Sequence, residues 1–262
     1  MSLWVQIGLG AAFIAATILA TLAIQAGSRY AALRLFGAEE VERSHELGQS
    51  LTFRIASLHG LILALVFAQE MGDYSGLRSA VLAEATAVAD IYNDIARYDP
   101  EGAAPVQAAL AEYVRHVGQE EFSRPDRHPE TFAQGWALRE TVYLAVLDLE
   151  PGTVRQEALR AHMIEDAQRI ATLRQQRENS TRAGIGALFW VAALGGTVLI
   201  AVSYATYPAG GAGRTLLALY AGYSGLVMFL ILAFADPFSP PGQLAPHPFD
   251  RLVAAGLGAP DS

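Results

Sequence analysis

The sequence contains no cysteine and no lysine, and it has few charged residues of any kind. The absence of cysteine excludes disulfide bonds and cysteine-ligated metal sites. Only 17% of the 262 residues are charged, whereas soluble domains average about 25%, and 52% are hydrophobic. This composition predicts a membrane protein. The formal net charge of -8 argues against the basic surface of a nucleic-acid-binding protein, so we expect no nucleic-acid partner.

The common motifs of catalysis and metal binding are missing as well. No GxSxG, P-loop or GxGxxG motif occurs between a predicted strand and a predicted helix. The scattered histidines form no HxxxH pair. We therefore expect no enzymatic activity, no cofactor and no bound metal.

Four long apolar runs are present, and each is long enough to cross a hydrocarbon core of about 30 Å as a helix. They cover residues 3–26, 50–74, 185–207 and 215–235. A cleaved signal peptide is the alternative for the first run. No positive charge precedes that run, however, and it exceeds the usual ~7–15 apolar residues of a signal peptide. Gly222 and Gly225 in the last run suit close helix packing in lipid.

The segment between the second and third runs, residues 75–182, is more polar and has helical periodicity. Four amphipathic stripes follow one another there, separated by helix-breaking pairs. These pairs are Asp99-Pro100, Arg124-Pro125, His128-Pro129 and Glu150-Pro151. The pattern predicts about four helices in a bundle outside the bilayer. We expect its acidic residues Glu84, Asp90 and Asp94 to form a solvated face.

The predicted fold is an all-α membrane protein, with four transmembrane helices and an extramembrane helical bundle inserted between spans 2 and 3. The predicted boundaries are 1–74 for spans 1 and 2, 75–182 for the bundle, 183–235 for spans 3 and 4, and 236–262 for a proline-rich tail with little regular structure. Arginines near the membrane ends of the bundle favour a cytoplasmic bundle by the positive-inside rule. They are Arg78, Arg169, Arg174, Arg177 and Arg182.

The second span differs from a simple anchor because one of its faces carries polar groups. At helical spacing this face holds Thr52, Ala56, His59, Leu63, Val66 and Glu70. Ionisable residues at membrane depth cost roughly 2.5–3.5 kcal/mol each on insertion scales, and they usually face a bundle interior or water. The second span is therefore a candidate pore-lining helix.

Each polar group of this span also has a more ordinary interpretation. His59 either lines water, where protonation would add positive charge to a pore, or forms a hydrogen bond between packed helices. Glu70 and Asp73 either form an acidic ring at a pore mouth, which favours cations, or mark the solvated exit of the helix. Arg54 either attracts anions or, as we expect, extends to the membrane interface.

The sequence resembles the bacterial bestrophin-like membrane proteins from Leu47 to about Val253. The resemblance rests on the second-span motif HGLILALVFAQE, on Glu84-Ala85 and Ile91-Tyr92 in the next helix, and on Asp236-Pro237-Phe238-Ser239 after the last span. It implies an ion channel, because bestrophins proper are pentameric channels. In those proteins the second helix of each subunit lines a central pore, and apolar rings form its neck.

By this resemblance the neck matches Leu63, Val66 and Phe67. The expected pore-lining residues are then His59, Leu63, Val66, Phe67, Glu70 and Asp73. The resemblance also implies a multi-pass protein of the bacterial inner membrane. Its expected partners are membrane lipid, inorganic ions and further copies of itself, in a homo-oligomer that is a pentamer. Bestrophin tails continue with calcium-binding acidic residues, whereas this chain continues Ser-Pro-Pro-Gly after Phe238, so a calcium gate is not expected.

Two other functional classes fit a helical bundle between membrane spans. One is a membrane-anchored sensor or scaffold whose bundle binds a partner; such a protein does not require His59 and Glu70 on one face of a span. The other is a secondary transporter, which the lack of paired broken helices and internal repeats disfavours. The polar face of the second span favours the channel, and its two acidic residues favour cation conduction.

Overall fold

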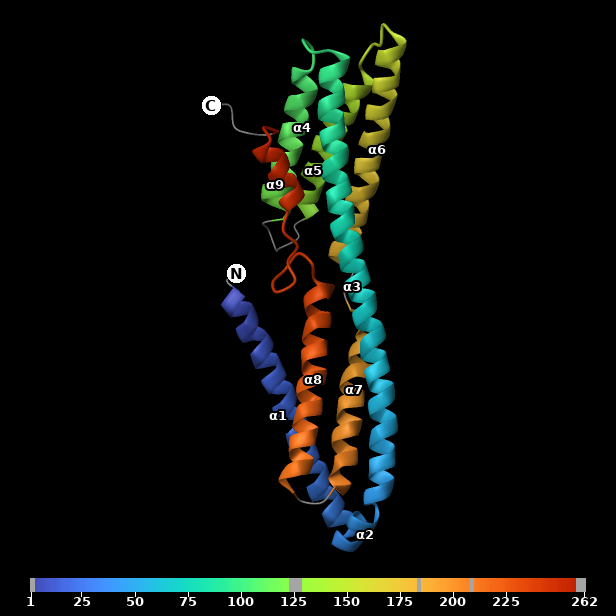
Figure 1. Cartoon of the computed structure of the whole chain (residues 1–262), viewed down its shortest axis with the longest axis vertical. Helices are drawn as coiled ribbons and strands as arrows, with labels where there is room; N and C mark the ends of the chain where they lie inside the picture. The colour runs from blue at the N-terminus through green and yellow to red at the C-terminus, as the bar shows by residue number, and fades with distance from the viewer. Residues whose placement is uncertain (1–2, 123–128, 183–184, 208–209, 258–262) are drawn as a thin grey trace. The chain divides into compact units, whose positions relative to one another are not determined.

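The computed structural model describes residues 3–122, 129–182, 185–207 and 210–257, and these residues form helices and no strand. The helices are α1 (Leu3–Phe36), α2 (Ala38–Arg43), α3 (His45–Tyr98), α4 (Ala104–His116), α5 (Pro129–Leu147), α6 (Val154–Arg182), α7 (Ala187–Ser203), α8 (Gly211–Ala235) and α9 (His247–Ala254) (Figure 1). Two short turns join them, the π-helical η1 (Val117–Glu121) and the 3-10 turn η2 (Tyr204–Thr206). The predicted all-α class is confirmed.

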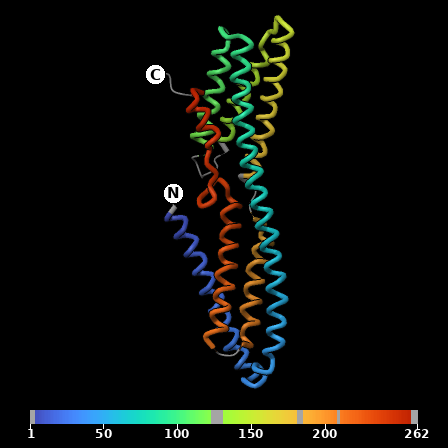
Figure 2. Tube along the Cα trace, in the orientation of Figure 1, coloured from blue at the N-terminus to red at the C-terminus, as the bar shows by residue number. Residues whose placement is uncertain are grey.

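Four of the helices are long and apolar enough to cross a membrane, which confirms the prediction of a four-span membrane protein. They are α1, α3, α7 and α8. The first half of α3 carries the apolar second run, and its second half carries the first amphipathic stripe. Figure 2 traces the order of these segments along the chain.

The chain forms two compact units, which we describe separately. The membrane unit comprises residues 1–73, 184–236 and 240–242, so it holds α1, α2, α7, α8 and the first half of α3. Here α1 packs along α8 and α7. A Cβ atom added at Gly225 of α8 would lie 3.0 Å from the side chain of Thr17 in α1, so a larger residue would push the two helices apart. This close approach is the packing role that the sequence predicts for Gly225.

The bundle unit comprises residues 74–183, 237–239 and 243–262. Its core is built from α3, α4, α5 and α6, which are the four helices expected between residues 75 and 182. Representative core residues are Val88, Leu110, Val146 and Met163, one from each helix, and each has a solvent-exposed fraction of 0%. Helix α3 ends at Tyr98, directly before the Asp99-Pro100 pair. Arg124-Pro125 and His128 lie outside the described residues.

The C-terminal tail is more ordered than the sequence analysis predicts. Helix α9 forms at His247–Ala254, and Phe249 in it is fully buried against the bundle core together with Phe238 and Leu244. The expectation of little regular structure is wrong for this segment, because the proline in its first turn suits a helix start and its apolar residues gain burial on the core.

Two glutamates and two arginines lie together in the core of the bundle unit. Glu84 of α3, Glu121 of η1, and Arg174 and Arg177 of α6 have side chains that are at most 1% exposed. Nε and Nη2 of Arg177 each donate to an oxygen of Glu84 at 3.1 Å, and its Nη1 donates to Glu121. Arg174 also donates to Glu121, and its Nη2 donates to the carbonyl oxygen of Phe132 at 2.9 Å. We call these four residues the buried charge cluster.

The buried charge cluster corrects two expectations from the sequence. The sequence predicts Glu84 on a solvated face, and it predicts Arg174 and Arg177 as charges that flank the membrane. All three are buried and paired with one another or with Glu121, so these arginines do not bear on the orientation of the chain. Asp94 is likewise buried and accepts a hydrogen bond from Arg97 at 2.6 Å.

Electrostatics within the buried charge cluster keep Glu121 ionised. Burial alone would raise the pKa of Glu121, but the charges of Arg177 and Arg174 and their hydrogen bonds outweigh burial and hold this pKa below its ordinary value. Burial raises the pKa of Tyr113 well above its ordinary value, and the charge of Glu84 raises it further. The Tyr113 hydroxyl therefore stays protonated and donates to Glu84.

Candidate functional site

The polar face of the second span points into the membrane unit. Thr52, His59 and Leu63 on this face are 8%, 2% and 4% exposed, so the other helices of the same chain cover them. The hydroxyl of Thr52 lies 2.6 Å from that of Ser203 in α7. This face of α3 therefore holds the membrane unit together within one protomer.

His59 links α3 to both α7 and α8. Its Nε2 lies 2.8 Å from the carbonyl oxygen of Ala193 in α7, and its Nδ1 is hydrogen-bonded to the hydroxyl of Tyr220 in α8. A carbonyl oxygen only accepts, so Nε2 carries a hydrogen. In the neutral ring Nδ1 then accepts, and the Tyr220 hydroxyl donates to it. Both ring nitrogens are thus satisfied inside one chain, which supports the helix-packing interpretation of His59.

Tyr220 is the partner that sequence reasoning missed. It lies within the fourth apolar run, well inside α8, where a tyrosine hydroxyl needs a hydrogen-bond partner away from the membrane interface. The sequence does place a tyrosine and a histidine in the middle of two different spans, and each needs a hydrogen-bond partner there. It does not show which spans are neighbours, so it does not pair the two residues.

The three predicted neck residues contribute to the apolar packing of the membrane unit. Leu63 belongs to a buried cluster with Ala193, Met228 and Ile231, and Val66 and Phe67 pack against this cluster while remaining partly exposed. The ring centroid of Phe67 lies 5.9 Å from that of Phe234, at an interplanar angle of 63°. In a single protomer Leu63 therefore contacts its own chain on α7 and α8.

The two acidic residues lie beyond the apolar cluster, toward the end of the span. Glu70 is half-buried, whereas Asp73 is exposed. The amide of Gln69 donates to both carboxylate oxygens of Asp73, at 3.0 and 2.9 Å. The structure therefore separates the predicted pore-lining residues into the covered pair His59 and Leu63, the partly covered Val66, Phe67 and Glu70, and the accessible Asp73.

The opposite side of the same span is open in the protomer. We call it the outer face of α3; it comprises Arg54, Ser57, Leu61, Leu65 and Ala68, which helical spacing places on one side, away from His59. Leu61 and Leu65 are 56% and 63% exposed. This face is mostly apolar in its middle, has Arg54 near one end, and is followed by Gln69 and Asp73 beyond the other.

Comparison with known proteins assigns a family. A sequence model described as a Bestrophin-like domain matches residues 19–249, which is most of the chain. No curated protein and no solved structure matches the chain. The extent of the family match shows that the chain belongs to the bestrophin-like family, which confirms the resemblance seen in the sequence.

Proposed function

We propose that this member of the bestrophin-like family is the subunit of an ion channel in the bacterial inner membrane. The subunits form a homo-oligomeric ring, a pentamer by analogy with bestrophins proper, and one α3 from each subunit lines the axis. The observation that carries this proposal is the outer face of α3, which the described residues of its own chain leave exposed along the apolar part of the span. The family match supports it independently.

The packing within the chain supports one side of α3 as the side that faces the axis. Helices α7 and α8 bind the His59 side through the contacts with Ala193 and Tyr220. In a closed ring with α3 innermost, the side turned away from its own chain faces the centre. The proposed lining is therefore the outer face of α3, and His59 and Leu63 hold α3 against α7 and α8 behind it.

The chemistry of the outer face suits a gated pore. Leu61 and Leu65 would form apolar rings, and hydrophobic constrictions of this kind close by dewetting. Val66 and Phe67 pack against the apolar cluster behind these rings and remain partly exposed. In this arrangement an ion crosses a short apolar section between a mouth that carries Arg54 and a mouth that carries Asp73.

The acidic mouth favours cations over anions. Asp73 is exposed just beyond the end of the outer face, so a ring of subunits would place one such carboxylate per subunit at this end, while Glu70 is half-buried on the His59 side of the helix. We expect reversal potentials in NaCl gradients to indicate cation preference, and Asp73→Asn with Glu70→Gln to reduce it. Glu39→Gln is the matched control, because Glu39 is an exposed glutamate on α2 that pairs with Arg43.

Electrical recording from the purified protein in planar bilayers tests the function itself. Unitary currents that require an oligomer in the preparation would support the proposal. A purified protein that is monomeric and passes no ions would contradict it. That outcome would favour the membrane-anchored scaffold instead. Two polar residues of the second span, His59 and Glu70, distinguish a channel from a scaffold in the sequence, and His59 is buried within its own chain.

A further inference from the structure

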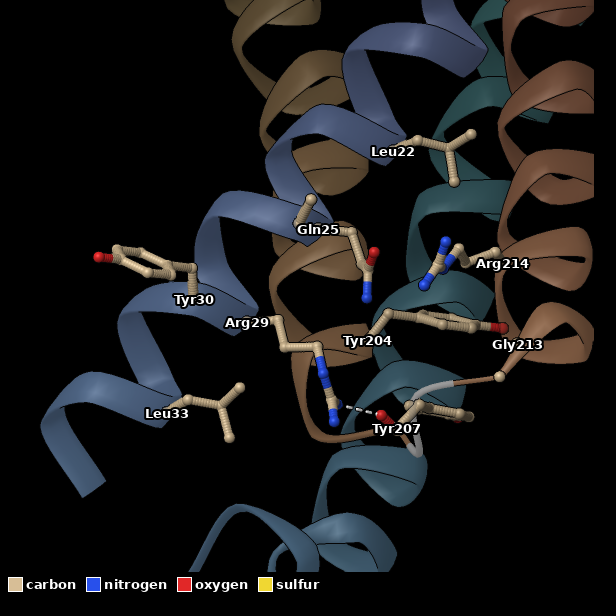
Figure 3. Close-up of a pocket in the computed structure, with 11 residues that line it drawn as sticks. Leu22, Gln25, Arg29, Tyr30, Leu33, Tyr204, Tyr207, Gly213 and Arg214 are labelled. Carbon is tan, nitrogen blue, oxygen red and sulfur yellow. Dashed lines mark hydrogen bonds between the residues drawn. The ribbon is translucent and has the colours of Figure 1, made fainter. Parts of the chain in front are cut away.

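A cavity of about 480 Å³ lies in the membrane unit, at the ends of three of its helices. Its walls come from the second half of α1, from the turn after α7 and from the first turn of α8 (Figure 3). These segments adjoin the ends of apolar runs and carry Arg29 and Arg214, so we expect the cavity to lie near a membrane interface. It is remote in sequence from the outer face of α3 and shares no residue with it.

Two arginines from different helices contribute to this cavity. Arg29 comes from α1 and Arg214 from α8, and Figure 3 shows the Arg214 side chain directed toward the α1 side, with Tyr204 between the two arginines. None of the eleven described lining residues is acidic. The lining therefore carries two positive charges without a compensating carboxylate, which favours an anionic ligand.

Both arginines retain hydrogen-bond donors for a ligand. Nη1 of Arg29 donates to the carbonyl oxygens of Ala205, at 3.0 Å, and of Tyr207. These bonds fix the guanidinium at the end of α7, and its Nε and Nη2 form no hydrogen bond within the described part of the chain. Arg214 is exposed and has no ion pair or hydrogen bond with any described residue. A guanidinium with free donors binds phosphate oxygens in bidentate fashion.

The rest of the lining is aromatic and apolar. The rings of Tyr204 and Tyr207 stack with centroids 4.2 Å apart and planes within 10° of parallel. Leu22 and Ala26 of α1 form the apolar wall, and Leu19, three residues before Leu22, continues it as an exposed side chain. Tyrosines at this depth lie at the level of lipid headgroups. The cavity thus joins a cationic pocket to an apolar surface that faces lipid.

We propose that this cavity binds an anionic phospholipid. Arg29 and Arg214 would both donate to the phosphate group, the headgroup would contact Tyr204, and an acyl chain would follow Leu22 and Leu19 along α1. A free phosphate ion would use the arginines but would leave the apolar wall without a role. A choline headgroup would bring its own positive charge to two arginines, so phosphatidylglycerol is favoured over phosphatidylcholine. The proposal is independent of the channel function.

Native mass spectrometry of the detergent-solubilised full chain tests this site. We expect phosphatidylglycerol to remain bound with an apparent affinity about tenfold higher than that of phosphatidylcholine, as expected when charge-assisted bonds to two arginines are gained. Arg214→Gln should remove most of this difference, since Arg214 forms no hydrogen bond or ion pair with any described residue. Arg29→Gln should do the same, but it also removes the two bonds to the turn after α7.

Arg34→Gln is the matched control, because Arg34 is an exposed arginine on the same helix that lies outside the cavity. Its preference for phosphatidylglycerol should equal that of the natural protein. Equal binding of both lipids to the natural protein, or an undiminished preference in Arg214→Gln, would overturn the proposal. Complete competition by inorganic phosphate at the concentration of the lipid would overturn the choice of lipid as ligand.

Discussion

Arg177 and Glu84 form a two-point ion pair inside the bundle unit, although 93 residues separate them in the sequence. Nε and Nη2 of the arginine each donate to one carboxylate oxygen at 3.1 Å, and neither side chain is more than 1% exposed. This pair joins α6 to α3, and Glu121 joins both arginines of α6 to η1. A π-helical turn such as η1 is uncommon, and here it carries the carboxylate that both arginines share.

Removing one member of this pair should destabilise the bundle unit strongly. We expect Glu84→Gln to cost about 3–5 kcal/mol, because it leaves Arg177 buried with only one carboxylate. Glu112→Gln on α4 is the control; Glu112 is exposed, so its replacement should cost less than about 0.5 kcal/mol. Hydrogen exchange in α3 and α6 measures the difference. Equal protection in the two variants would show that the pair does not stabilise these helices.

Two adjacent glycines in α7 should respond very differently to the same substitution. A methyl group added at Gly196 would overlap the ring of His59, whereas one added at Gly195 would meet nothing within 4 Å. Gly196→Ala should therefore cost about 1–3 kcal/mol through overpacking. Gly195→Ala should be neutral or slightly stabilising, because alanine favours a helix over glycine. Thermal unfolding in one detergent compares them; similar midpoints would contradict the placement of His59 against α7.

The stability of the bundle unit should fall as the pH rises above 6.5. His162 of α6 donates from Nδ1 to Asp94 at 2.8 Å, and this bond raises the pKa of His162 above its ordinary value of 6.5, with the charges of Asp166, Asp94 and Asp90 adding to the effect. Since the folded pKa is the higher one, the stabilisation is complete below pH 6.5 and is lost as the pH rises through the folded pKa.

The measurement is the unfolding midpoint of the full chain between pH 6 and 9, compared with that of His162→Gln. The variant replaces the titrating imidazole with a neutral side-chain amide. It should therefore flatten the dependence of the unfolding midpoint on pH in this range. A variant whose pH profile matches that of the natural protein would assign the effect to another group. The expected change is small, because the His162 side chain is 54% exposed and its ion pair is screened by water.

Much of the architecture follows from local sequence patterns. Apolar length alone predicts the four membrane helices, and the breaker pair at Asp99-Pro100 predicts the end of α3. Residues such as Val88 and Ile95 follow the helical period, so the sequence also predicts that they face a core. These features depend on neighbours within one helix, which a sequence displays directly.

Features that depend on which helices are neighbours were not predictable in this way. The sequence could show that His59 needs a partner or water, but not that Tyr220 lies opposite it. Glu84 has the same spacing whether it faces water or Arg177, so the periodic pattern could not separate these cases. For the same reason the polar side of the second span was expected to face a pore, whereas His59 and Leu63 on it contact α7 and α8 of their own chain.

The most direct test of the channel proposal uses the absence of cysteine, since the natural protein offers no background reaction with thiol reagents. Leu61→Cys introduces a thiol on the outer face of α3, and Leu63→Cys introduces one on the covered face of the same helix. We expect a water-soluble thiol reagent to block the current of Leu61→Cys within the assembled protein and to leave that of Leu63→Cys unchanged. Block of Leu63→Cys alone, or of neither variant, would contradict the claim that the outer face of α3 lines the pore.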